Sequence, residues 1–122
     1  MTALASYQDL EVWKKSIDWV EQIYLASKNF PSEEKFGLTS QLRRAAVSAP
    51  SNIAEGAARR GTGEFLQFLS VASGSLAEAE TQLILAQRLK ILQTSTADSL
   101  LSEAEIISKM LGGLKRSLQS RR

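Results

Sequence analysis

The chain of 122 residues contains neither cysteine nor histidine. Without cysteine there is no disulfide framework and no thiolate chemistry, which is the composition favoured in a reducing compartment. Without histidine the chain lacks the commonest general base and zinc ligand, and a Ser-His-Asp arrangement is excluded. A glycine-rich phosphate loop of the form GxxxxGK[ST] is also missing. We therefore predict that the protein is not an enzyme and that it carries no metal or organic cofactor.

Long apolar segments are missing as well. No stretch approaches the roughly twenty apolar residues that a membrane-spanning helix needs, and the first ten residues lack the basic segment of a signal peptide. Hydrophobic residues make up 43% of the chain and charged residues 23%, which is ordinary for a globular domain. These features predict a single cytoplasmic domain with no membrane partner.

Apolar residues recur at spacings of three and four along most of the chain, and no segment alternates as a strand would. The pattern predicts helices over residues 9–28, 32–60, 62–92 and 96–118, joined by short polar turns. Four amphipathic helices of this kind predict an all-α fold, an antiparallel up-and-down four-helix bundle spanning residues 1–122. In the first helix we expect the core to be lined by Leu10, Trp13, Ile17, Val20 and Tyr24. Trp13 or Trp19 in a subunit interface is the alternative.

The stretch from Gln41 to Arg60 combines an apolar stripe, a proline and several arginines. The stripe stays in phase through Pro50, which predicts a kinked helix rather than two separate helices. Ser48, Ser51 or the amide of Asn52 could bond the backbone groups that the proline frees. The opposite side carries a polar stripe: Arg44, Ser48, Ser51, Glu55 and Arg59. This side is either a solvated face with a Glu55–Arg59 ion pair or a surface that meets a partner.

This stretch also carries a resemblance, through Leu42 to Ala46, Ser48, Pro50 and Asn52 to Gly56. With Leu10 to Lys15 upstream and Glu64 to Glu80 downstream, it resembles the bacterial four-helix bundle family first noticed as reading frames within intervening sequences of 23S ribosomal RNA genes. The resemblance implies a bundle that assembles into a ring, usually a pentamer. The chain is also similar to the accessory protein of diversity-generating retroelements, which binds a reverse transcriptase and nucleic acid. For most members of the family no biochemical role is established.

Several positions in the second and third helices are assigned to interfaces or to the structural motif. Gly74 costs its helix about 1 kcal/mol relative to alanine. We therefore expect a close approach to the small residues Ala45, Ala46 and Ala49. For Glu80 and Glu55 we favour a salt bridge to Arg44 over a metal site, because no histidine accompanies them. The full set is Trp13, Pro50, Asn52, Glu55, Gly56, Gly74 and Glu80.

The net charge of +2 hides an uneven distribution. Residues 35–60 carry five basic side chains against one acid, and residues 109–122 carry five with none. Clustered lysine and arginine are what phosphate binding requires. The candidate nucleic-acid-binding residues are Arg43, Arg44, Arg59, Arg60, Lys115 and Arg116.

Two functional classes fit these observations. The first is a non-catalytic oligomeric adaptor that binds RNA or DNA, together with a reverse transcriptase or another nucleic-acid enzyme. The alternative is a structural or protein-interaction module in which the arginines hold subunits together. Salt separates the two classes, because phosphate binding weakens steeply with ionic strength whereas apolar interfaces do not.

Overall fold

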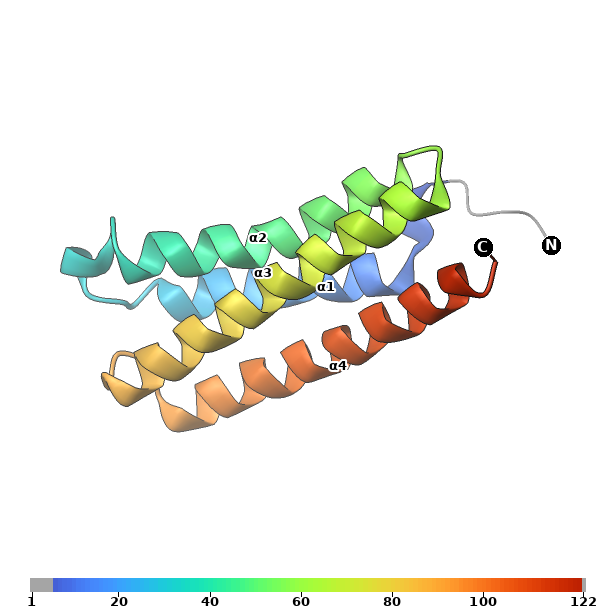
Figure 1. Cartoon of the computed structure of the whole chain (residues 1–122). Coiled ribbons are helices and arrows are strands. Elements are labelled where there is room, and N and C mark those ends of the chain that lie inside the picture. The colour runs from blue at the N-terminus through green and yellow to red at the C-terminus, as the bar shows by residue number, and fades with distance from the viewer. Residues whose placement is uncertain (1–5, 122) are drawn as a thin grey trace.

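The computed structural model describes residues 6–121, and within them the chain forms four α-helices and no strand. They are α1 (Glu11–Ser27), α2 (Leu38–Ala57), α3 (Thr62–Arg88) and α4 (Thr94–Gln119). Successive helices run in opposite directions and lie side by side as a bundle (Figure 1). The predicted all-α, four-helix fold is therefore confirmed. No helix of this part of the chain is long and apolar enough to cross a membrane.

The helix ends differ from the predicted bounds at several places. Residues Tyr7–Asp9 form a 3₁₀ turn before α1, in which the Asp9 carboxylate accepts a hydrogen bond from the Ser6 N–H. α2 begins at Leu38 rather than at Ser32, and Ser32–Glu34 is a separate 3₁₀ turn. The Glu34 side chain caps α2 by accepting a hydrogen bond from the Leu38 N–H at 3.1 Å. This reach-back cap places the start of α2 after Gly37, where the backbone leaves the helical region.

α3 ends at Arg88, before the predicted end at residue 92, because the backbone of Lys90 turns left-handed with φ of 62°. The N–H groups of Ile91 and Leu92 then both donate to the carbonyl of Ala86, at 2.9 and 3.2 Å. These bonds close the C-terminus of the helix in the way a left-handed residue after a helix usually does. Glycine commonly occupies such a left-handed position. Because the residue here is a lysine, the sequence did not predict that α3 ends at Arg88.

α2 continues through Pro50 as one helix, and Pro50 is buried. The Asn52 amide donates to the carbonyl and the hydroxyl of Ser48, at 2.8 and 2.9 Å. The hydroxyl of Ser48 in turn lies 2.7 Å from that of Ser75 in α3. A short chain of polar contacts thus joins α2 to α3 beside the proline. The Asn52 amide bonds the backbone at the carbonyl of Ser48 and not at that of Ala46, the group that loses its donor to Pro50.

The close approach between α2 and α3 occurs at Gly56, not at Gly74. A Cβ on Gly56 would lie 2.7 Å from the Cβ of Phe68 and 3.0 Å from Cδ1 of Phe65. A Cβ on Gly74 would meet no atom within 4 Å, and Gly74 is exposed. The expectation that Gly74 packs against the alanines of α2 is therefore wrong for the single chain. Those alanines face the core instead, and all three are buried.

The stripe of α1 that faces the core is not the one expected from the sequence. Its buried residues are Val12, Ser16, Trp19, Ile23 and Ser27. Trp13 is half-buried and packs edge-on against Tyr7, with ring centroids 5.3 Å apart, and Tyr24 is exposed. Ser16 and Ser27 occupy core positions without being apolar, so the spacing of apolar residues did not reveal this stripe. The Ser16 hydroxyl satisfies itself by donating to the carbonyl of Val12 at 2.7 Å.

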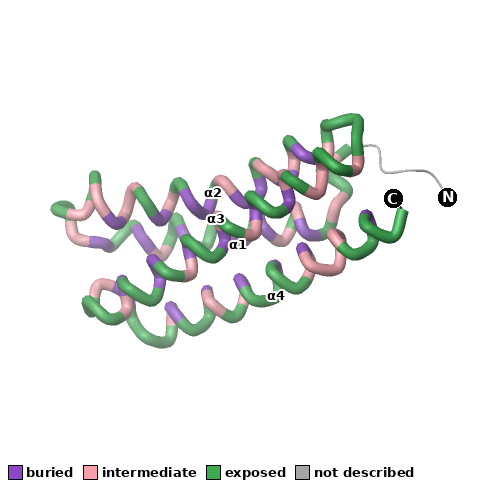
Figure 2. Tube along the Cα trace, viewed as in Figure 1, coloured by how far each residue is buried: buried purple, intermediate pink, exposed green. Residues whose placement is uncertain are grey.

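In the other three helices most buried residues recur at spacings of three and four, as the sequence pattern predicted, and Figure 2 shows the buried positions turned toward the centre of the bundle. The buried residues of α3 are Leu69, Ala72, Leu76, Ala79, Gln82, Leu83 and Ala86. Those of α4 are Ala97, Leu100, Ala104, Ile107, Leu111 and Leu118. The polar side chains on the opposite faces of these helices remain available for partners.

Candidate nucleic-acid interface

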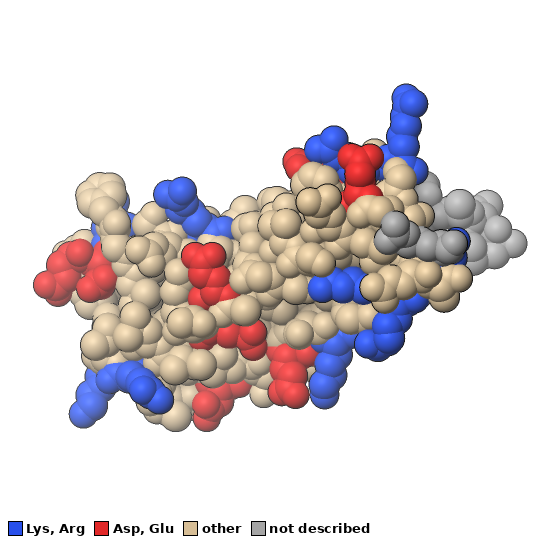
Figure 3. Space-filling view, viewed as in Figure 1, with Lys and Arg blue, Asp and Glu red and all other residues tan. Residues whose placement is uncertain are grey.

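Basic side chains gather at the end of the bundle where α2 meets α3 and where α4 ends (Figures 1 and 3). Arg59 and Arg60 lie in the turn after α2, and Lys115, Arg116 and Arg121 lie in or just after the last turns of α4. All are exposed except Lys115, which is half-buried. We call these five residues the basic end. The up-and-down topology brings two basic segments together that lie more than fifty residues apart in the chain.

Arg59 is held in place by two contacts at this end. Its guanidinium lies 3.6 Å from a carboxylate oxygen of Glu55, one helical turn earlier, and 4.9 Å from the ring centroid of Phe68. An exposed pair of this kind stabilises a helix by only about 0.2 to 0.5 kcal/mol. The ion pair is the one that the solvated-face interpretation predicted. Glu55 therefore pairs with Arg59 and not with Arg44.

Two glycines and a serine position the basic side chains of α4. The Lys115 ammonium donates a hydrogen bond to the hydroxyl of Ser73 in α3 at 2.8 Å. A Cβ on Gly112 would lie 3.4 Å from Nη1 of Arg116, and one on Gly113 would lie 3.9 Å from Nη2. The guanidinium of Arg116 thus lies along the glycine pair of its own helix. The two glycines leave room for this placement and do not interrupt α4, which continues to Gln119.

Arg43 and Arg44 are remote from the basic end and differ from each other. Arg43 donates to the hydroxyl of Ser27 at 2.8 Å and lies 4.5 Å above the ring of Tyr24, so α1 holds it. Arg44 is exposed, and among residues 6–121 it makes no hydrogen bond or ion pair. It lies thirteen residues before the end of α2, which is about 20 Å along the helix. The six candidate residues thus form one group of four and two separate arginines.

Glu80 in α3 faces another carboxylate rather than an arginine. Burial, and then the nearby charge of Glu105 in α4, raises the pKa of Glu80. Within the described residues Glu80 makes no salt bridge, so the expected bond to Arg44 is not formed in the single chain. The same part of the chain holds no group of three acidic side chains arranged to bind a metal ion.

The model of the 23S rRNA-intervening sequence protein family matches residues 8–113. The chain belongs to this family. No curated protein matches it. It is also similar to a crystal structure from Bacteroides thetaiotaomicron VPI-5482, described as a protein with unknown function from the S23 ribosomal protein family. That structure is 25% identical and has a TM-score of 0.79, and the match covers 85% of this chain and 97% of that one. The family resemblance inferred from the sequence is confirmed.

The family match divides the basic end. It includes Arg59 and Arg60 but stops before Lys115, Arg116 and Arg121. The contacts of Ser48 with Asn52 and with Ser75 lie inside the matched range, and so does Gly56. The part of the chain that matches the family therefore contains the whole contact between α2 and α3. Lys115, Arg116 and Arg121 thus lie outside the matched range.

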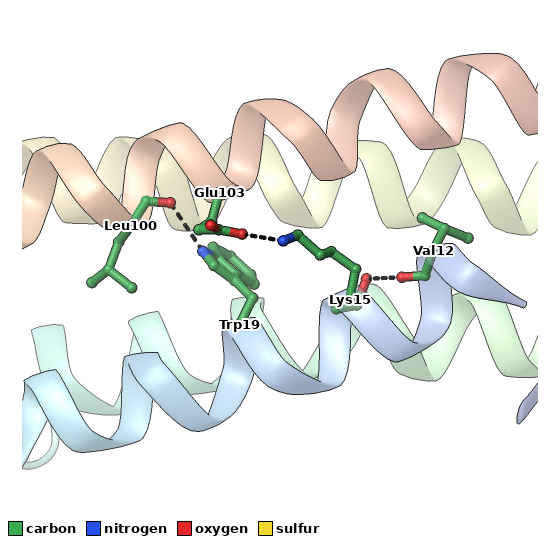
Figure 4. A network of polar contacts seen from close by, with 6 residues as sticks. Val12, Lys15, Trp19, Leu100 and Glu103 are labelled. Carbon is green, nitrogen blue, oxygen red and sulfur yellow. Dashed lines mark hydrogen bonds and ion pairs between the residues drawn. The ribbon is translucent and has the colours of Figure 1, made fainter.

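The described part of the chain also contains an open cavity of about 720 Å³ between α1 and α4, lined in part by Trp19, Gln22, Ser99 and Glu103. The indole N–H of Trp19 donates to the carbonyl of Leu100 at 3.1 Å, and the ammonium of Lys15 lies 2.8 Å from Glu103 (Figure 4). The sequence carries no signal for this ion pair, because nothing in helical spacing links residues on α1 and α4. Because Lys15 and Glu103 pair with each other, we assign this ion pair to the packing of α1 against α4.

Proposed function

We propose that the protein is a non-catalytic, oligomeric adaptor that binds the phosphate backbone of RNA or DNA through its basic end. The observation that carries the proposal is the meeting of Arg59 and Arg60 with Lys115, Arg116 and Arg121 at one end of the bundle. Glu55 and Glu64 are acids of the same region, and Glu55 neutralises part of the charge of Arg59. The remaining four basic side chains have no acidic partner among the described residues.

The charge of one subunit is modest, so assembly is part of the proposal. Affinity for nucleic acid comes from the release of counterions by clustered lysine and arginine, and it grows with the number of phosphates neutralised. A ring, which the family resemblance suggests is a pentamer, would present several basic ends to one nucleic acid. Linked contacts of this kind raise the overall affinity without any new contact in the subunit.

The occupant we favour is structured RNA or DNA held beside a nucleic-acid enzyme such as a reverse transcriptase, in the cytoplasm. The support for this partner is the resemblance to the accessory protein of diversity-generating retroelements. Apart from Arg59, the residues of the basic end contribute positive charge without an aromatic ring beside it. None of the other four lies over an aromatic ring among the described residues. We therefore expect binding through phosphates, with little dependence on base sequence.

The test is binding of a fluorescent structured RNA measured by anisotropy at several salt concentrations. The double variant Arg60→Gln and Arg116→Gln should bind more weakly, and its salt slope should fall by about 0.7 to 0.9 for each phosphate that is no longer neutralised. Arg88→Gln is the matched control, because Arg88 is an equally exposed arginine at the other end of the bundle. An assembled protein that ignores RNA and DNA at low salt would contradict the proposal and favour the protein-interaction module.

A further inference from the structure

The outward face of α3 contains a glycine that the single chain does not explain. A Cβ at Gly74 would meet open space, yet a glycine in the middle of a 27-residue helix loses more conformational freedom on folding than alanine would. One turn away, Val71 is 48% exposed. On the neighbouring helix α2, Val47 is 38% exposed. The two helices thus present aliphatic side chains to solvent, and α3 presents a position with no side chain at all.

Opposite charges accompany these apolar positions. Arg44 lies one turn before Val47 on α2, is exposed, and has no ion-pair partner among the described residues. Glu78 lies one turn after Gly74 on α3 and is exposed as well, with only a long 3.4 Å hydrogen bond from Gln82. The outward face of α2 therefore presents a cation and then a valine, and that of α3 presents a valine, a glycine and then an anion.

The contacts between α2 and α3 show which residues lie at the same height along the bundle. Ser48 contacts Ser75, and Gln41, seven residues earlier, contacts Gln82, seven residues later. Because the helices are antiparallel and rise equally per residue, Arg44 lies level with Ala79, next to Glu78. By the same register Val47 lies level with Leu76, between the small residues Gly74 and Ala77 on the outward side of α3. Arg44 and Glu78 therefore differ in height by one residue, about 1.5 Å, and Val47 and Gly74 by two residues, about 3 Å.

From this register we infer that α2 of one copy docks on the outward face of α3 of a second copy, with Arg44 paired to Glu78 and Val47 seated at Gly74. A rotation about an axis parallel to the helices preserves height, so it brings these residues opposite each other. The two faces differ, which makes the contact head-to-tail, and head-to-tail contacts close into rings when the rotation permits. Neighbouring helices of a bundle face outward in different but not opposite directions, as a closed ring requires. The inference rests on the assembly part of the proposed function and names its surface.

Charge reversal tests the pairing. Light scattering of the wild-type protein should give a multiple of the 13.4 kDa subunit mass. Arg44→Glu and Glu78→Arg should each lower the mass to that of one subunit, and an equimolar mixture of the two variants should restore association into particles larger than one subunit. The double variant Arg44→Glu/Glu78→Arg should restore the wild-type mass, because an odd-numbered ring cannot alternate the two single variants throughout. Restoration by mixing occurs only if the pair joins different copies. Lys28→Glu and Glu21→Arg are the matched reversals at exposed positions in α1 or at its end, outside both faces, and they should leave the mass unchanged.

Gly74 supplies a second readout with opposite signs. Gly74→Ala should raise the melting temperature of the dissociated subunit, because the methyl group meets no neighbour, and should weaken association. Gly113→Ala on α4 is the control, with a rise in melting temperature and no change in mass.

The outcomes distinguish failure of this surface from failure of nucleic-acid binding. A wild-type monomer overturns the assembly and this surface together. A wild-type assembly that survives both charge reversals, or two reversed variants that stay monomeric when mixed, overturns the surface alone. RNA binding at the basic end is measured independently on monomeric Arg44→Glu, which retains all five residues of that end.

Discussion

The contact surface between α2 and α3, the α2–α3 seam, and that between α1 and α4, the α1–α4 seam, are packed in opposite ways. At the first, the helices approach so closely that Gly56 has no room for a Cβ against Phe65 and Phe68. At the second, the indole of Trp19, only 2% exposed, lies between the helices and reaches the backbone of α4. An open cavity of about 720 Å³ remains beside it. The α2–α3 seam depends on Gly56, which has no side chain, and the α1–α4 seam depends on one large side chain, that of Trp19.

The comparison shows where each seam is vulnerable. A close seam fails when atoms are added, because helix backbones cannot separate without disturbing their other contacts. A wide seam fails when its spacer is removed, because the space then fills poorly. The close seam also contains the polar Ser48–Ser75 contact, which makes its register specific. The contact proposed above between two copies is argued from this register.

Truncation of Trp19 should have the largest effect. Trp19→Ala removes the spacer of the α1–α4 seam and should destabilise the protein by about 3 to 5 kcal/mol, measured by urea unfolding. Trp13→Ala is the control, because Trp13 is only half-buried and should cost clearly less. Equal losses for the two tryptophans would show that the seam does not depend on Trp19.

Addition of one methyl group should break the other seam. Gly56→Ala places Cβ 2.7 Å from the Cβ of Phe68, so the helices must separate. Overpacking of this kind costs about 1 to 3 kcal/mol, which outweighs the gain of about 1 kcal/mol in helix propensity. Thermal unfolding should therefore show a lower melting temperature than wild type. A stabilised Gly56→Ala protein would mean that the seam opens freely.

The Ser48–Ser75 contact should contribute less than either of these. Loss of a neutral hydrogen bond costs about 0.5 to 1.5 kcal/mol, so Ser48→Ala and Ser75→Ala should each destabilise by that order. The double variant should cost less than the two single effects added together, because the second substitution removes a partner already unpaired. Simple additivity in chemical unfolding would indicate that the two hydroxyls act independently.

The sequence identified the helices whose core contains a continuous row of apolar residues, including α3, where Gln82 is buried beside that row. It failed for α1, where serines interrupt the row. The stripes of α2, α3 and α4 were found because Leu, Ile and Ala recur without interruption. For α1 the buried stripe includes Ser16 and Ser27, and a neighbouring row of large apolar residues produced a stronger signal. The hydroxyl of Ser16 bonds within its own helix, which no hydrophobic pattern can reveal.

The candidate interface was only partly accessible from the sequence for a related reason. Spacing along the chain identified the Glu55–Arg59 pair, since the two residues are four positions apart. It could not show that Arg43 is held by Ser27 and Tyr24 of α1, or that Lys15 pairs with Glu103 of α4. Contacts between helices depend on their relative rotation, which periodicity leaves open. The same limit explains why Gly74 was assigned to the wrong side of α3.

At the contact between α3 and α4, a partly buried charge rather than the shape of a side chain lowers the stability of the fold. We expect the smallest effect on stability there. Burial first and the Glu105 carboxylate second raise the pKa of Glu80 above its ordinary value. Because the folded-state pKa is the higher one, ionisation of Glu80 opposes folding. The stability associated with the protonated form is complete below the unfolded-state pKa and is lost as pH rises through the folded-state pKa. Glu80→Gln should therefore match wild type in acid and exceed it slightly at neutral pH.

Melting temperatures measured from about pH 3 to about pH 8 would show this difference developing as the carboxyl group ionises. Glu105→Gln should produce a smaller gain in the same direction, since it removes only the second of the two causes. Glu64→Gln is the control, because Glu64 is exposed in the first turn of α3, where a negative charge favours the helix. If Glu80→Gln followed the wild-type curve at every pH, neither burial nor the Glu105 carboxylate would be acting on Glu80.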